Sequence, residues 1–236
     1  MQLEKNIFLS HCVINPKCPM DRSQISNINI YNDNKLVKSI SINNFLEEYI
    51  LTETKEFQLR VNMIQMLKGK YQLKLLNCIL FLTNRRLKVT NANKCYRNIF
   101  SRPKMEIVSK SLRKYICKET LAFNKQLCIV DKCYHEAFST FNKLSNTLTD
   151  LKSLQSIFSE ELEAVEEHLE NLSDDLYKIY NAWFTIRCHF KDIIKIYQNY
   201  HCYSKIQFLN KYNIKYAKDI TKLIEMSLKT IKVIYK

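Results

Sequence analysis

One glycine and three prolines in 236 residues restrict the folds open to this chain more than any other feature of its sequence. Between Lys104 and Lys236 there is neither glycine nor proline, so no residue in that stretch intrinsically breaks a helix. Sheet-rich proteins and dinucleotide-binding enzymes need glycine for tight turns and for close approach of the backbone to phosphate. The sequence therefore favours an all-α fold and argues against those enzyme classes.

A heptad repeat of hydrophobic residues runs through the glycine-free stretch. With Phe141 at position a, the core positions run from Ile116 to Tyr200, and all of them are hydrophobic except Thr120 and Gln155. Such a strict repeat predicts long helices that keep one stripe against other helices and supercoil, as in a coiled coil or an extended bundle. The pattern fits one long helix, and it fits equally two shorter helices joined by a turn that the sequence does not mark.

The seam of this repeat is wider than a two-stranded coiled coil needs. Large aromatic residues occupy core positions, among them Trp183, the single tryptophan, which we expect to be a packing anchor. Apolar residues also occupy the flanking positions, where a two-stranded coil favours charge. We therefore expect a bundle of three or four helices, with part of it supplied by another chain. The expected interface residues are Leu144, Leu148, Leu151, Phe158, Leu162, Val165, Leu169, Leu172, Leu176, Ile179, Trp183, Ile186, Phe190 and Ile193.

The chain divides by composition into five segments. The first, residues 1–42, is expected to be an irregular arm with a small β-hairpin, because short alternating apolar runs flank the turn-forming residues 32–35. The others are expected to be an N-terminal helical segment, a basic loop, a long coiled-coil or bundle region and a basic amphipathic C-terminal helix. Their ranges are 43–90, 91–103, 104–203 and 204–236.

Three local signals place the boundaries of the first helical segment. Asn44 and Glu47 have the spacing of a capping box, so the helix is expected to begin near Asn44. Gly69 interrupts the apolar pattern that follows, and the pattern then resumes. Residues 84–103 combine asparagines, arginines and a proline, and they are the strongest candidate for a loop.

Charge is segregated along a chain whose formal net charge is +14. Residues 160–175 hold acidic side chains and no lysine or arginine, whereas residues 84–118 and 205–236 are strongly basic. A basic balance permits contact with nucleic acid, with microtubule-like acidic polymers or with anionic lipid. The alternative for the basic stretch is a solvated loop. The candidate polyanion contacts are Arg85, Arg86, Lys88, Lys94, Arg97, Arg102 and Lys104.

No motif in the sequence indicates catalysis or a metal site. The cysteines and histidines have neither zinc-finger spacing nor a small disulfide framework, and no phosphate-binding loop or nucleophile motif occurs. We expect no catalytic residue, no metal, no cofactor and no small-molecule substrate. The most apolar run, 75–82, is too short to cross a bilayer, so no transmembrane segment is expected. Because no signal peptide is recognisable, we expect a cytoplasmic or nuclear protein that is not secreted.

These features favour a structural role. The first hypothesis is a non-enzymatic subunit of a multi-protein helical assembly, with other helical subunits as its partners in a hetero-oligomer. By analogy alone, the spindle, the kinetochore or other cytoskeletal machinery in mitosis and cell division is the expected setting. The second hypothesis is a basic chromosomal protein that binds nucleic acid. The third is a peripheral membrane adaptor that uses the C-terminal helix.

Overall fold

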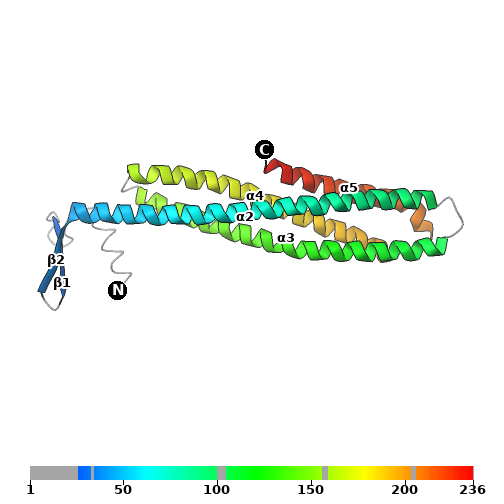
Figure 1. Cartoon of the computed structure of the whole chain (residues 1–236), viewed down its shortest axis with the longest axis horizontal. Helices are drawn as coiled ribbons and strands as arrows, with labels where there is room; N and C mark the ends of the chain where they lie inside the picture. The colour runs from blue at the N-terminus through cyan, green and yellow to red at the C-terminus, as the bar shows by residue number, and fades with distance from the viewer. Residues whose placement is uncertain (1–25, 33–34, 100–104, 156–158, 203–205, 236) are drawn as a thin grey trace. The chain divides into compact units, whose positions relative to one another are not determined.

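The computed structural model describes residues 26–32, 35–99, 105–155, 159–202 and 206–235. Within these residues the chain forms a two-stranded hairpin followed by four helices that pack against one another (Figure 1). The prediction of an all-α bundle with a small N-terminal β-hairpin is therefore confirmed. In chain order the elements are β1 (Asn27–Asn32), β2 (Lys35–Ser41), α2 (Ile42–Ile99), α3 (Met105–Gln155), α4 (Ser159–Cys202) and α5 (Ile206–Val233).

The chain divides into two compact units, and three of the helices contribute residues to both. The first unit consists of Met1–Gln65 and Lys143–Ser173, and the second of Met66–Asn142 and Asp174–Lys236. The hairpin belongs to the first unit, and α5 belongs to the second. Each unit has its own buried core, as described below.

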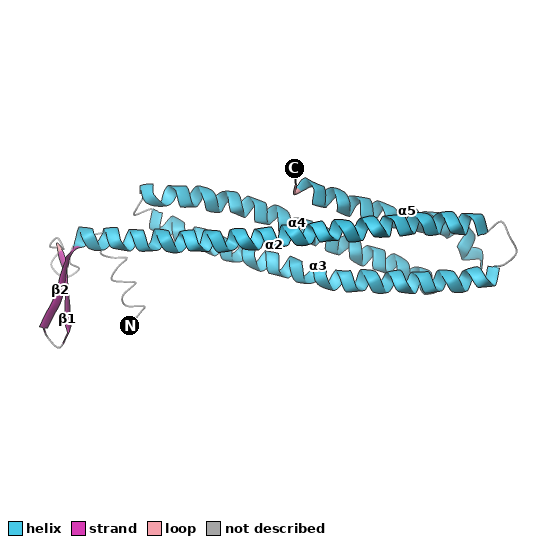
Figure 2. Cartoon of the chain, in the orientation of Figure 1, coloured by secondary structure: helices cyan, strands magenta, loops and turns pink. Residues whose placement is uncertain are grey.

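The hairpin is antiparallel, and it is joined directly to the first helix. Asn27 pairs with Ser41 at its open end, and a bulge lies between Ile30 and Tyr31. The backbone N–H of Ile42, the first residue of α2, donates to the carbonyl of Ser26 at 2.9 Å. This hydrogen bond ties the strands to the start of the helix. Figure 2 shows the two strands immediately before α2.

Helix α2 begins two residues earlier than the capping-box spacing predicts. The backbone N–H of Asn44 donates to Ser41 Oγ at 3.2 Å, so Ser41 is the N-cap and Asn44 is inside the first turn. The prediction that Asn44 and Glu47 form the cap is therefore wrong. Both serine and asparagine are good caps, and the hydrogen-bonded strand that ends at Ser41 decides between them.

Helix α2 is also longer than predicted, because it continues without a break to Ile99. It passes through Gly69, where the sequence pattern predicted an interruption, and through most of the predicted basic loop. Asn84 and Asn91 are exposed, while Val89 of the same stretch is buried in the core of the second unit. Packing of that buried face outweighs the weak helix propensity of asparagine.

The long heptad region forms two helices. α3 ends at Gln155, one of the two polar seam positions, and α4 begins at Ser159, while residues 156–158 lie outside the described part of the chain. In α4 the buried residues follow the predicted heptad positions, whereas in α3 only every second predicted position is buried, as at Leu144 and Leu151. A heptad repeat reports which side of a helix is buried, and it does not report whether the partner helix belongs to the same chain.

All four helices contribute to the core of the second unit. Helix α2 supplies Tyr71, Leu75, Cys78 and Leu82, which follow one another at intervals of four, three and four residues. Helix α4 supplies the largest buried side chains. The fully buried members from α2 and α3 include Leu75, Cys78, Leu82, Phe123, Val130 and Ala137, and those from α4 and α5 include Trp183, Ile186, Phe190, Ile193, Tyr197, Ile220, Ile224 and Ile231.

The first unit has a smaller core supplied by three helices. Its buried side chains come from the beginning of α2, the end of α3 and the beginning of α4. They include Phe57, Val61, Ile64, Leu144, Leu151, Leu162, Val165, Leu169 and Leu172.

Candidate interaction surfaces

The predicted interface seam is buried by the chain's own helices. Leu148 is half-buried, and Phe158 lies outside the described residues. Trp183 is completely covered, as a packing anchor should be. These residues are therefore not a free surface for a partner chain. The buried members of the seam are Leu144, Leu151, Leu162, Val165, Leu169, Leu172, Leu176, Ile179, Trp183, Ile186, Phe190 and Ile193.

Aromatic rings hold three helices of the second unit together. Phe123 of α3 lies edge-on to Phe81 of α2 and to Phe190 of α4, with ring centroids 5.2 and 5.3 Å apart. Tyr197 continues the cluster, and burial raises the pKa of its hydroxyl far above the ordinary value. The hydroxyl stays protonated at any physiological pH, which fits a role in packing.

Arg85, the first predicted polyanion contact, is engaged inside the second unit. Its Nη1 donates to both carboxylate oxygens of Glu119 on α3, at 2.8 and 3.0 Å. The guanidinium also lies over the ring of Phe81, 5.0 Å from the centroid. Glu119 is 1% exposed, so the pair is shielded from solvent. Because a buried carboxylate needs its partner, Arg85 is a structural residue and is not free to bind phosphate.

The other predicted polyanion contacts differ in their availability. Arg86 pairs with Glu225 of α5 at 3.1 Å on the surface of the second unit. Lys88 and Lys94 are exposed on α2. Arg97, Arg102 and Lys104 have side chains outside the described part of the chain. The exposed lysines lie on a helix, in contrast to the predicted loop.

The acidic stretch uses some of its charge within the first unit. Lys152, in the last turn of α3, pairs with Glu166 at 3.4 Å and with Glu170 at 3.1 Å, both on α4. Arg60 of α2 approaches Asp150 of α3 at 3.9 Å. These pairs are substantially exposed, so each contributes little to stability but helps to select the pairing of the helices.

A buried histidine joins α4 and α5 in the second unit. His189 Nδ1 lies 2.8 Å from the hydroxyl of Ser227, which itself donates to the carbonyl of Leu223. The hydroxyl therefore accepts the hydrogen bond from Nδ1–H. Burial lowers the pKa of His189, and Asp192 opposes this to a smaller extent. This favours the neutral ring, which satisfies the buried serine.

The cysteines give no metal centre among the described residues, where no group of three metal-binding side chains comes together. Cys78 and Cys133 are buried, while Cys117 and Cys128 are exposed. Burial raises the pKa of the Cys78 thiol to about 11. A thiol of such high pKa is a poor nucleophile and behaves as a small apolar core residue.

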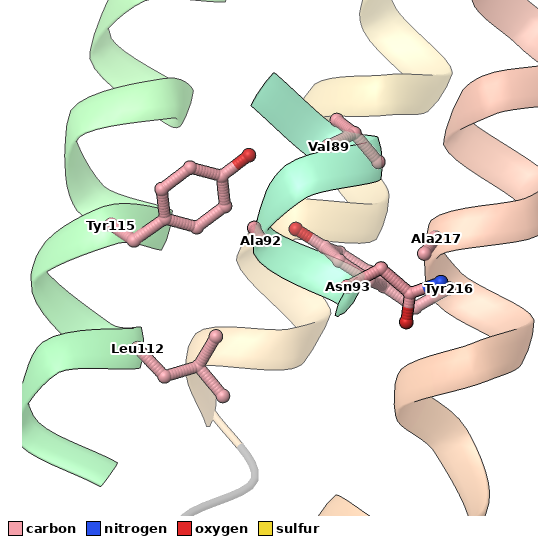
Figure 3. A pocket seen from close by; sticks show the side chains of 7 residues that line it. All are labelled: Val89, Ala92, Asn93, Leu112, Tyr115, Tyr216 and Ala217. Atoms are coloured by element: carbon pink, nitrogen blue, oxygen red, sulfur yellow. The ribbon is translucent and has the colours of Figure 1, made fainter. Parts of the chain in front are cut away.

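A cavity in the second unit lies where α2, α3 and α5 meet. Its volume is about 20 Å³, which holds roughly one water molecule. It therefore has no room for a substrate. Figure 3 shows the residues that line it, which are Val89, Ala92, Asn93, Leu112, Tyr115, Tyr216 and Ala217.

The apolar face of α5 is buried in the second unit, which leaves no free apolar stripe for a membrane surface on the described part of this helix. Ile220, Ile224 and Ile231 are all fully covered. Among the described residues, no helix has the combination of length and apolar character that a membrane crossing requires.

Apolar side chains remain exposed on α2, and the sequence interpretation missed them. In the second unit they are Met66, Leu73, Leu76, Leu80 and Leu87, and in the first unit they are Leu51, Leu59 and Met63. The interval of seven residues between Met66, Leu73, Leu80 and Leu87 is the signal that would have revealed four of them.

Comparison with known proteins gives no further assignment. No protein-family model, no curated protein and no solved structure matches this chain significantly.

Proposed function

We propose that this chain is a non-enzymatic structural subunit of a multi-protein helical assembly. The observation that carries the proposal is an apolar surface in the first unit. Leu51, Leu59 and Met63 of α2 are each more than half exposed, as are Leu36 and Val37 of β2. Leu59 and Met63 are four residues apart, so they are neighbours on the surface of α2, and neighbouring exposed apolar side chains are typical of a binding site for another protein.

The hairpin supports the same proposal. Leu36 and Val37 are neighbours in β2, so their side chains point to opposite faces of the strand. Both are exposed, although an isolated two-stranded hairpin is only marginally stable in water. A partner that covers these side chains, or that pairs with a free strand edge, would stabilise the hairpin.

The setting of the assembly is proposed from charge and composition. The chain carries a net charge of +14, with an acidic stretch between two basic regions. Segregated charge orients partners and increases their rate of association more than it adds affinity. A cytoskeletal assembly such as the spindle or kinetochore, next to an acidic polymer such as the microtubule, is the proposed location.

The test is purification of the tagged full-length chain from its own cells, followed by cross-linking and mass spectrometry. The wild type is expected to retain a fixed set of helical proteins, with cross-links to the first unit. Leu59→Glu combined with Met63→Glu should lose them. Ser145→Glu combined with Asn146→Glu adds the same charge at exposed positions of α3 in the same unit and should retain them. Equal retention by both double variants would contradict the proposal.

Nucleic-acid binding is the second candidate, and the exposed lysines of α2 are the observation that favours it. Lys88 and Lys94 are exposed and pair with no acidic side chain among the described residues, whereas Arg85 is paired with Glu119. Exposed lysines of this kind can neutralise phosphate. Binding to duplex DNA should weaken steeply with salt and should fall when both lysines are replaced by glutamate. If binding is weak and does not depend on these lysines, the structural role stands alone.

A further inference from the structure

Helix α2 carries a second line of apolar residues on its solvent side in the second unit. Met66, Leu73, Leu80 and Leu87 follow one another at intervals of seven residues and are 76%, 61%, 66% and 58% exposed. Single exposed leucines are ordinary on protein surfaces. Four apolar residues in strict heptad spacing are not ordinary, because seven residues is the repeat that keeps one stripe against another supercoiled helix.

Polar residues complete the heptad pattern. Four residues after each apolar residue stands Lys70, Asn77, Asn84 or Asn91, and all of them are exposed. With the apolar residues at position d, these residues occupy position a. A single asparagine at position a specifies the register and the oligomeric state of a coiled coil at a cost in stability, and here three consecutive a positions are asparagine.

We propose that this face of α2 binds a second copy of the chain, with the two α2 helices parallel and in register. In that arrangement each leucine meets its own counterpart and each asparagine meets its own counterpart. An asparagine side chain has both donors and an acceptor, so it can pair with its copy. An antiparallel arrangement would place asparagines against leucines and leave their amides unpaired, which is unfavourable.

The charge of this face predicts how the dimer behaves. Residues 66–99 contain lysines and arginines but no acidic residue, so two copies repel each other weakly along the seam. Lys70 at position a and Lys94 at the position d that follows Leu87 bring like charges together, although their long side chains can carry the ammonium groups into solvent. We therefore expect a dissociation constant in the micromolar range that decreases as salt is added, because salt screens the repulsion.

The first experiment measures the mass of the purified full-length chain by sedimentation at concentrations from about 1 to 200 μM. The wild type should change from monomer to dimer, and Leu73→Glu combined with Leu80→Glu should remain monomeric. Leu121→Glu is the matched control, since Leu121 lies on α3 of the same unit and is 57% exposed. The control should dimerise like the wild type. Circular dichroism establishes that each variant is folded.

The second experiment tests orientation and register. Asn84 meets its own counterpart in a parallel in-register dimer, so Asn84→Asp alone and Asn84→Lys alone should each weaken association at least tenfold. A mixture of the two variants should restore it as a heterodimer, because opposite charges then meet. Asn84 is exposed on the surface of α2, so both variants are expected to fold.

Three results would overturn the proposal. They are a wild type that stays monomeric throughout the concentration range, a dimer that survives the paired glutamate substitutions, and a mixture of the Asn84 variants that associates no better than each alone. A monomer that instead binds an acidic helix through this face, more weakly as salt rises, identifies a different occupant. The function proposed above rests on residues of the first unit, so its variants succeed or fail independently.

Discussion

Replacement of Gly69 by alanine should stabilise the protein. Gly69 lies in the interior of α2, and a Cβ added there would meet no atom within 4 Å. The substitution therefore creates no clash and buries no new surface. Alanine is favoured over glycine in an exposed helix interior by about 1 kcal/mol, mainly because glycine loses more backbone freedom on folding.

For a chain of this length, a gain of about 1 kcal/mol raises the melting temperature by roughly 2–4 °C. Thermal unfolding followed by far-ultraviolet circular dichroism measures the shift. Gly69→Pro is the matched control of opposite sign, since proline in a helix interior removes a hydrogen bond and costs about 3 kcal/mol or more. If alanine destabilises the chain or proline is tolerated, α2 is interrupted at this residue and the reasoning is refuted.

Three further predictions test the second unit. Arg85→Met leaves a buried carboxylate unpaired and should lower the free energy of unfolding, measured by denaturant titration, by about 3–5 kcal/mol. Arg86→Met breaks an exposed ion pair and should change the free energy of unfolding by less than about 1 kcal/mol in the same titration. Because burial lowers the pKa of His189, the unfolded chain binds a proton at this histidine more readily than the folded chain does. The contribution of His189 to stability is therefore fully present above the unfolded pKa of about 6.5 and is lost as the pH falls below that value. His189→Gln should flatten that part of the stability profile. In the folded chain, an alkylating reagent should modify Cys117 rapidly and Cys78 only after unfolding, as peptide mass spectrometry would show.

The sequence predicted the features that depend on which side of a helix is buried. The seam of α4 was visible as a heptad repeat, and its seam positions from Leu162 to Tyr197 are buried as expected, Trp183 among them. In α3 the prediction was half right, because Leu144 and Leu151 are buried while the alternate seam positions Phe141 and Leu148 are only half-buried and the adjacent Thr140 and Thr147 are buried in their place. The hairpin was visible because turn-forming residues separate two short alternating runs. The heptad signal repeats many times, and the hairpin signal coincides with a strong turn. Because both signals are local in sequence, neighbouring segments do not override them.

The boundaries and the partners were not predictable in the same way. Asn44 and Ser41 are equally good caps, and only the hydrogen-bonded end of β2 makes Ser41 the cap. The basic stretch has the composition of a loop, yet the burial of Val89 keeps it helical. Arg85 was predicted to contact phosphate because Glu119 is distant from it in the sequence. Glu119 becomes the partner of Arg85 only when α2 packs on α3. Tertiary contacts of this kind leave no periodic signal.

Helix α2 differs from the helices around it in having two apolar lines, and this difference explains why its pattern was misread. In the second unit the inner line runs through Tyr71, Leu75, Cys78 and Leu82, and the outer line contains Leu73 and Leu80. Apolar residues on both sides weaken the contrast between faces on which a sequence interpretation depends. The inner line is fully used within the chain, so it contains no information about partners. The outer line is mostly exposed and contributes little to the fold of a single chain, and a bundle that needed only to be soluble would place polar residues there. The outer leucines therefore predict a partner, and the response of association to salt identifies the charge of that partner. Association that strengthens with salt indicates a second basic copy of the chain. Association that weakens with salt indicates an acidic helix.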